Sequence, residues 1–116
     1  MSKDIRRIEI ILDKIEYLNN ILDKFDGKIS KALEDKIVFR PALLMHLVAI
    51  AEQFDKLKKE NSPLLTQFPG THTKGIYDVR TFIAHDYEGI NISVIENVIR
   101  YGIPDISNIC KEIINK

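Results

Sequence analysis

Residues 40–59 read RPALLMHLVAIAEQFDKLKK, and apolar side chains recur along them at alternating steps of four and three residues: Leu43, Leu47, Ile50, Phe54 and Leu57. This spacing places the side chains on one face of an α-helix, and such a seam can pack along a second helix. Pro41 is suited to the first turn of a helix, and the lysines near residue 59 complement the negative end of the helix dipole. The stretch therefore predicts a helix from Pro41 to about Lys59.

A second apolar seam precedes this helix, and it comprises Ile5, Ile8, Ile11, Leu12, Ile15, Leu18, Leu22 and Phe25. The pattern predicts a helix from about Lys3 to about Phe25. A break is expected at Asp26-Gly27, because glycine can adopt the positive φ of a helix C-cap. A short helix is expected from Ser30 to about Lys36. It should end before a boundary near Arg40, because the residue before a proline disfavours the α conformation.

The helical period is lost after residue 59 and then returns. Asn61 to Lys74 contains Asn-Ser-Pro and Pro-Gly, which are typical of loops, so we expect one long loop here with a turn at Leu64-Leu65. Helical spacing resumes after Gly75 and predicts a helix that ends near Gly89.

The remaining residues, 90–116, again carry apolar side chains at helical spacing. Asn91 or Ser93 can cap the helix that begins here, and Pro104 restarts or kinks the last helix. No stretch of the sequence alternates apolar and polar residues between hairpin turns, as a β-strand would. The chain is therefore predicted to be an all-α bundle of four or five helices.

The chain has 116 residues, of which 45% are apolar and 29% are charged. This length and composition predict a globular protein with a single domain over residues 1–116, and they exclude a disordered or low-complexity chain. Seventeen basic residues balance seventeen acidic ones. A nucleic-acid partner must therefore be held by a local cluster of charge, and a purely electrostatic nucleic-acid binder is excluded.

Three features predict a soluble protein of the cytoplasm that has no membrane partner. Cys110 is the only cysteine and cannot form an intrachain disulfide, which suits a reducing compartment. No apolar run approaches the roughly 20 residues that span a bilayer. The N-terminal residues Met1-Ser2-Lys3-Asp4 enter a charged helical pattern, whereas a signal peptide needs an apolar core.

Histidines are the residues best suited to catalysis here, because the sequence has no glycine-rich phosphate loop, no HExxH or GxSxG motif and no calcium-binding loop. His46 lies beside the apolar seam of residues 40–59, which favours a packed or half-exposed structural histidine. His72 lies between two threonines in the expected loop, which favours a solvated side chain and leaves it a weak candidate. His85 differs from both, because it lies at the end of an apolar helix within the octet RTFIAHDY, residues 80–87.

This octet carries the pattern Arg-x4-His-x-Tyr through Arg80, His85 and Tyr87, and the full pattern has a chance expectation of about 0.005 in such a chain. Five residues of ideal helix turn by about 140° and rise by about 7.5 Å, so Arg80 and His85 point in different directions, whereas Tyr87 would return to the face of the arginine. Arg80 and His85 could act on one substrate if the helix ends near His85. They could also do so if two copies of the helix meet across a dimer axis and share one cleft. A symmetric homodimer is therefore expected.

Structural roles for the same residues stay open on spacing alone. Arg80 can pair with Asp78, Glu52 or another carboxylate, and His85 can cap the C-terminus of its helix. Tyr87 can be a half-buried aromatic residue with its hydroxyl group in water.

At this motif the sequence resembles the HEPN superfamily and, within it, the HepT-like toxins of prokaryotic toxin–antitoxin pairs, which are small all-α proteins. Residues 42–52 resemble the family's central helix with its Ile-Gly-Glu-Ala-like stretch, and residues 83–90 resemble its Ile-His-Asp-Tyr-Phe-Gly segment. Ile103-Pro104 matches a Leu-Pro in the family's final helix. The similarity extends from residue 40 to residue 114. One position departs from the family, because Thr81 stands where nuclease members usually have Asn, Asp or His.

The resemblance implies the toxin of a type VII-like toxin–antitoxin system: a homodimeric, metal-independent endoribonuclease without a cofactor, whose composite active site lies at the subunit interface. RNA supplies the 2′-hydroxyl as its own nucleophile, so His85 would move protons and Arg80 would hold the phosphate. Tyr87 matches the tyrosine to which a partner minimal nucleotidyltransferase of the MntA type adds AMP. That modification would neutralise the toxin by repelling RNA.

Two other functions stay open on the sequence. One is a non-catalytic helical subunit that pairs with a nucleotidyltransferase and presents substrate or nucleotide, with Arg80 as an anion contact. The balanced charge and Thr81 favour this interpretation. The other is a structural dimerisation bundle, in which the octet would be accidental.

Overall fold

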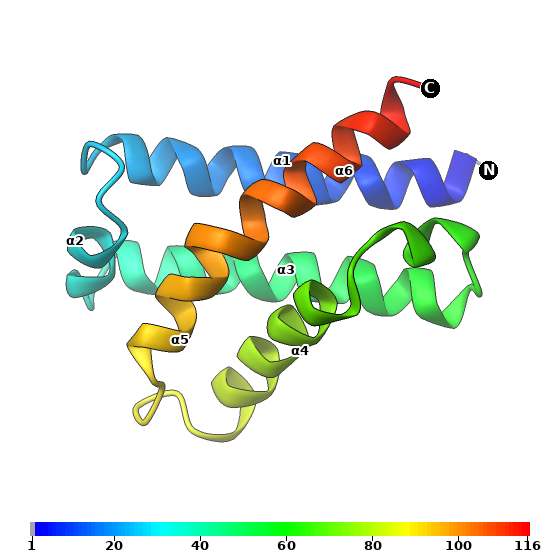
Figure 1. The fold of residues 1–116 in the computed structure, drawn as a ribbon. Coiled ribbons are helices and arrows are strands. Elements are labelled where there is room, and N and C mark those ends of the chain that lie inside the picture. Colours follow the sequence, from blue (N-terminus) through cyan, green and yellow to red (C-terminus); the bar gives the residue numbers. More distant parts are fainter. Residues whose placement is uncertain (1) are drawn as a thin grey trace.

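The structure, a computed structural model, describes residues 2–116, and Met1 of the charged N-terminal stretch lies outside them. Within these residues the chain forms only helices and loops, which confirms the predicted all-α fold (Figure 1). The first four helices are α1 (Ser2–Asp23), α2 (Ile29–Glu34), α3 (Phe39–Lys59) and α4 (Gly70–His85). The fifth is continuous and consists of α5 (Ile92–Asn97), the π-helical turn η2 (Val98–Gly102) and α6 (Ile103–Ile114). A 3-10 turn, η1 (Pro63–Gln67), lies between α3 and α4.

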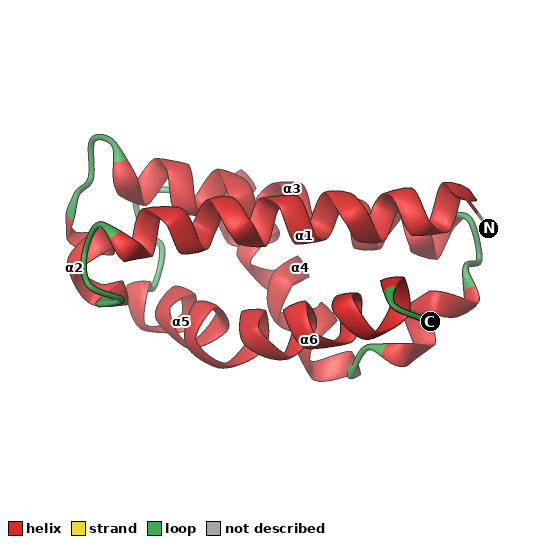
Figure 2. Cartoon of the chain, turned by 90° about the horizontal axis from the view of Figure 1, so that it is seen from above, coloured by secondary structure: helices red, strands yellow, loops and turns green. Residues whose placement is uncertain are grey.

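The two long helices, α1 and α3, lie side by side and antiparallel (Figure 1, Figure 2). The predicted seam of α3 is fully buried; its side chains are Leu43, Leu47, Ile50, Phe54 and Leu57. The seam of α1 is buried at Ile8, Ile11, Ile15 and Leu18, whereas Ile5, Leu12, Leu22 and Phe25 are partly buried against the same core. Burying one such side chain stabilises a fold by roughly 1.5–3 kcal/mol relative to leaving it exposed. At one end of the pair, the rings of Phe25 and Phe39 meet edge to face at 5.0 Å between centroids.

The remaining helices cover this pair. α6 packs across α1, and α4 packs on α3 (Figure 1). Seen from above, α5 and α6 form a row opposite α1 and α3 (Figure 2). Their apolar side chains join the same core, which includes the Cys110 thiol, and burial raises the pKa of that thiol to about 12. No helix within residues 2–116 has the length and apolar character needed to cross a membrane.

Two predicted boundaries are wrong. The expected loop of residues 61–74 is shorter, because η1 occupies part of it and α4 already begins at Gly70. The first turn of α4 is polar and mostly exposed, so it has no apolar period to reveal it. The helix expected to end near Gly89 ends at His85. The residues after it form a turn in which Asp86 Oδ1 accepts a hydrogen bond from the Gly89 amide at 3.1 Å.

Other local signals are confirmed. Gly27 follows α1 with a φ of +78°, and the Asn91 side chain caps α5 by accepting a hydrogen bond from the Ser93 amide at 3.0 Å. Pro104 does not interrupt the helix but lies just after η2, in which the Ile103 amide donates to the Val98 carbonyl five residues back. A proline lacks an amide donor and crowds the carbonyl four residues before it, and a π-helical turn accommodates this locally.

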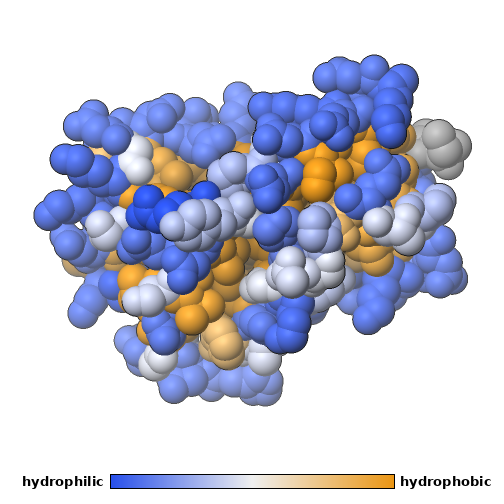
Figure 3. All heavy atoms as spheres, viewed as in Figure 1, coloured by the Kyte–Doolittle hydropathy of each residue, from blue (hydrophilic) through white to orange (hydrophobic). Residues whose placement is uncertain are grey.

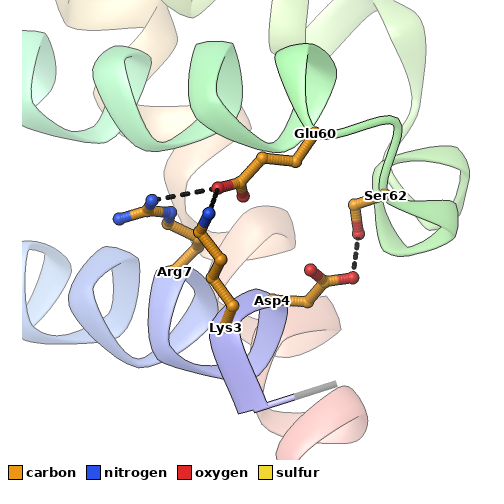
Figure 4. A network of polar contacts seen from close by, with 5 residues as sticks. All are labelled: Lys3, Asp4, Arg7, Glu60 and Ser62. Carbon is orange, nitrogen blue, oxygen red and sulfur yellow. Dashed lines mark hydrogen bonds and ion pairs between the residues drawn. The ribbon is translucent and has the colours of Figure 1, made fainter.

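A polar network ties the N-terminus of α1 to the corner after α3 (Figure 4). Glu60 Oε2 accepts a hydrogen bond from the Arg7 guanidinium at 3.1 Å and lies 2.9 Å from Lys3 Nζ. The Ser62 hydroxyl donates to Asp4 Oδ2 at 2.6 Å. The hydrogen bonds from Arg7 and then Lys3 lower the pKa of Glu60 below its ordinary value. Ionised Glu60 therefore stabilises the folded state at neutral pH, and this contribution is lost as the pH falls through the lowered pKa.

We predict that Glu60→Gln lowers the free energy of unfolding at neutral pH, because it removes the charge that Arg7 and Lys3 contact. The difference from the wild type should shrink as the pH falls through the lowered pKa of Glu60, because the wild-type carboxyl then becomes protonated as well. Urea denaturation over this pH range measures both effects. Glu52→Gln, on the exposed face of α3, is the matched control and should show neither. A deficit in Glu60→Gln that stays constant with pH would contradict the role of the charge.

Candidate active site

α4 carries the three motif residues or places them at its end. It buries only Ile76 and Val79 fully, and the residues of its last turns that carry the motif are mostly exposed. Figure 1 shows α4 at the edge of the bundle, beside α3. Arg80, His85 and Tyr87 are all exposed. Because Arg80 and His85 lie on one regular helix, they diverge by about 140°, as the sequence predicts.

Arg80 lies on the flank of α4 that faces α3. There the hydrogen bond from Lys59 lowers the pKa of Asp55, and the charge of Arg80 lowers it further. No carboxylate of residues 2–116 lies within 4.0 Å of the Arg80 guanidinium. Asp78, a pairing partner considered from the sequence, instead pairs with Lys74 at 2.8 Å. The guanidinium is therefore free to contact an anion.

His85 lies on the opposite flank and lines a groove of about 310 Å³ between the end of α4 and the start of α5. Apolar side chains of Phe82, Ile90 and Val94 line the same groove. The C-cap of α4 is Asp86, whose amide donates to the Phe82 carbonyl, so a His85 side-chain cap is not seen. The imidazole thus faces an open, mostly apolar groove.

Tyr87 does not return to the face of Arg80, because α4 ends two residues before it. It lies in the turn formed by Asp86 and Gly89, and 37% of its surface is exposed. This position brings Tyr87 close to His85 along the chain and leaves its ring exposed, not half-buried as the structural alternative from the sequence supposed.

Thr81, the position that departs from the family pattern, is exposed at the groove of His85. Its hydroxyl donates to the Tyr77 carbonyl at 3.0 Å, one helical turn earlier. This hydrogen bond satisfies the hydroxyl proton within α4 and leaves the oxygen as an acceptor.

The other histidines lie outside this groove. His46 is half-buried on α3 against Tyr17, with 5.5 Å between ring centroids, and burial followed by the Lys14 charge lowers its pKa. The expectation of a structural histidine is met. His72 is not in a loop but in the first turn of α4, where its Nε2 lies 3.0 Å from Asp105 Oδ2 of α6.

The apolar lining of the groove is the part of the site that the sequence did not identify. Phe82 is 41% exposed, and Asn91 lines the groove as well as capping α5. The phenylalanine between Arg80 and His85 could have indicated an apolar site from the sequence. Whether it is exposed depends on how α4 packs, which the sequence alone does not show. Within residues 2–116 no three His, Cys, Asp or Glu side chains are grouped so that they could hold a metal ion.

The helical fold and the exposed Arg-x4-His-x-Tyr motif define a protein of the HEPN type. The family model described as ribonuclease HepT-like matches residues 11–113. The chain therefore belongs to the HepT-like ribonuclease family. No solved structure matches the chain.

A Cβ at Gly89 would overlap the Asp86 carboxylate in its present position, where it accepts the hydrogen bond from the Gly89 amide. We predict that Gly89→Ala lowers the free energy of unfolding by about 1 kcal/mol, since the carboxylate must rotate and lose its hydrogen bond to residue 89. Urea denaturation measures the change. Gly70→Ala, where nothing lies within 4 Å of the added Cβ, is the control and should cause no loss.

If this mechanism holds, Gly89→Ala should cost no further stability in an Asp86→Ala background, because the overlap is then absent. An additive loss in the double variant would contradict it.

Proposed function

We propose that this protein is a metal-independent endoribonuclease that acts as a homodimer, in which Arg80 and His85 of both subunits form one composite site. The observation that carries the proposal is the placement of Arg80 and His85 on opposite flanks of α4, each exposed and directed away from the other. Membership of the HepT-like ribonuclease family supports RNA as the substrate.

RNA cleavage needs more acid–base groups than a single chain provides. Cleavage by the 2′-hydroxyl requires a base for that proton and an acid for the leaving 5′-oxygen. One imidazole beside one phosphate cannot reach both oxygens in line, whereas two His85 residues related by a two-fold axis would supply both groups. The Arg80 guanidinium would hold the phosphate and stabilise the charge of the transition state. RNA brings its own nucleophile, so this scheme includes no metal-bound water.

Exposed apolar surface around the motif supports the same interface. Phe82 lies between Arg80 and His85 in sequence and is exposed in the single chain, beside the groove that Ile90 and Val94 line. A second copy of α4 would cover part of this surface and remove it from water.

We further propose that the protein is the toxin of a type VII-like toxin–antitoxin pair and that a minimal nucleotidyltransferase adds AMP to Tyr87. Exposure alone does not select this tyrosine, because Tyr101 is 65% exposed against 37% for Tyr87. The position of Tyr87 supports the assignment, since it follows His85 by two residues in an irregular turn. A phosphodiester there would oppose the entry of an RNA phosphate.

We predict that the protein cleaves single-stranded RNA in excess EDTA and leaves a 2′,3′-cyclic phosphate. Arg80→Ala and His85→Ala should each lower turnover by a factor of about 10² or more, because they remove charge stabilisation and proton transfer. Circular dichroism and ultracentrifugation should show both variants folded and dimeric. Loss of cleavage with EDTA would contradict metal independence, and full activity in either variant would favour the non-catalytic binding subunit.

Dimers that contain one wild-type chain and one His85→Ala chain test whether both histidines act in one site. Such a dimer keeps a single His85, so a composite site that needs both a base and an acid should fall to nearly the activity of the His85→Ala homodimer. Two sites that each lie within one chain would instead keep roughly half of the wild-type activity. Coexpression with two affinity tags isolates this species.

We predict that incubation with the cognate nucleotidyltransferase and ATP adds AMP to the peptide that contains Tyr87, and that RNA cleavage is lost in parallel. Mass spectrometry and a cleavage assay measure the two effects. Tyr87→Phe should resist both, whereas Tyr101→Phe, at a more exposed tyrosine, should be modified and inhibited like the wild type. Modification at another residue, or modification without inhibition, would overturn this account of control.

A further inference from the structure

A second groove, of about 340 Å³, lies between the first half of α4 and the turn η2. Val94 lines both this groove and the groove of His85, so the two adjoin along the same side of α4. The space-filling view shows apolar surface between α4 and α5 on this face (Figure 3). A ligand that enters beside His85 can therefore extend along α4 into the second groove.

Two glycines line the second groove from opposite walls, Gly75 on α4 and Gly102 at the end of η2. Neither has a positive φ, so the backbone does not require glycine at either position. Steric crowding does not require it either. A Cβ on Gly75 would lie 3.6 Å from the nearest side-chain atom, in Val98, and one on Gly102 would lie 3.7 Å from His72 Nδ1, which are ordinary contact distances.

Glycine inside a helix is destabilising relative to alanine, because it loses more backbone freedom on folding. Gly75 and Gly102 each lower the stability of the helix in this way, although alanine would fit at both positions. The shared effect of both glycines is to leave the groove between α4 and η2 open. We take this as evidence that the open groove has a use.

The lining of the groove matches a flat ring with a polar edge. Tyr101 lines the groove with 65% of its surface exposed and supplies an aromatic ring, and Asn97 supplies an amide that both donates and accepts hydrogen bonds. Val94 and Val98 supply apolar walls. A phosphate would fit less well, because the nearby His72 already contacts the Asp105 carboxylate at 3.0 Å.

We propose that this groove binds an unpaired nucleobase of the RNA substrate, stacked on Tyr101, while the scissile phosphate lies at His85. The proposal rests on the ribonuclease function proposed above and adds a subsite to it. Aromatic side chains bind bases of single-stranded nucleic acid by stacking, with little dependence on sequence. The chain has no net positive charge to attract RNA. Such a subsite would let it bind RNA by base stacking and not by long-range electrostatic attraction.

The test uses the full-length protein and a fluorescein-labelled 2′-O-methyl dodecamer of mixed sequence, which lacks the nucleophile and is not cleaved. Fluorescence anisotropy measures its Kd. Gly75→Ala and Gly102→Ala should each raise the Kd several-fold while leaving the melting temperature equal to or above that of the wild type. Gly70→Ala adds the same methyl group to α4 outside both grooves and should leave the Kd unchanged. Tyr101→Ala should raise the Kd about tenfold, and Tyr101→Phe should keep wild-type binding.

Cleavage separates the subsite from the catalytic groove. A dinucleotide substrate occupies only the groove of His85, so Gly75→Ala should leave its kcat/KM unchanged while raising KM for a cleavable dodecamer. Unchanged dodecamer binding in Gly75→Ala and Gly102→Ala would overturn the subsite and leave the ribonuclease proposal intact. A shift in oligomeric state in these variants, without a change in RNA affinity per dimer, would also overturn it by showing that a second copy fills the groove. Absence of both RNA binding and cleavage in the wild type would overturn both proposals.

Discussion

The antiparallel packing of α1 against α3 is the interaction on which the rest of the structure depends. Their buried seams form the centre of the apolar core, and α4 and the continuous helix α5–α6 are placed by packing on these two helices. At one end of the pair, Glu60 joins Arg7 and Lys3 across the two helices, at the corner where the chain leaves α3. α4 is placed by its own packing on α3 through the buried side chains of Ile76 and Val79, so the position of the motif follows from the same apolar core.

The sequence predicts each helix of the bundle, and its errors fall at the two ends of α4, which bury no continuous apolar face. α1 and α3 each repeat apolar residues over several turns, so their period is clear. The first turn of α4, Gly70 to Thr73, is largely exposed and polar, and nothing in its composition separates it from a loop. α4 ends where Asp86 takes an extended backbone with a φ of −158°, and the Asp86 carboxylate then accepts a hydrogen bond from the Gly89 amide; local sequence suggests this turn only through the glycine.

For the motif too, the sequence predicts what depends on one helix and not what depends on packing. Helical geometry alone predicts that Arg80 and His85 diverge, and the structure agrees, because this property needs only the helix. Which surface each side chain faces could not be predicted. The arginine lies toward Asp55 of α3, and the histidine faces a groove made with α5, so both surroundings come from residues distant in sequence. The grooves themselves arise where α4 and the α5–η2 segment meet. The apolar period of a single helix does not predict which other segment it contacts.

The balance of charge constrains how such a protein can hold RNA. Seventeen cations and seventeen anions produce no net attraction, and many of the cations are already paired on the surface, as Lys74 is with Asp78 and Arg100 with Glu96. Arg80 forms no ion pair within residues 2–116, although its charge lowers the pKa of Asp55 on α3. It lies on the flank of α4 opposite the groove of His85 and remains exposed there. Two copies of α4 at a two-fold axis would double this local charge without changing the ratio of charges in the chain, so dimerisation would create a positive site that the single chain lacks.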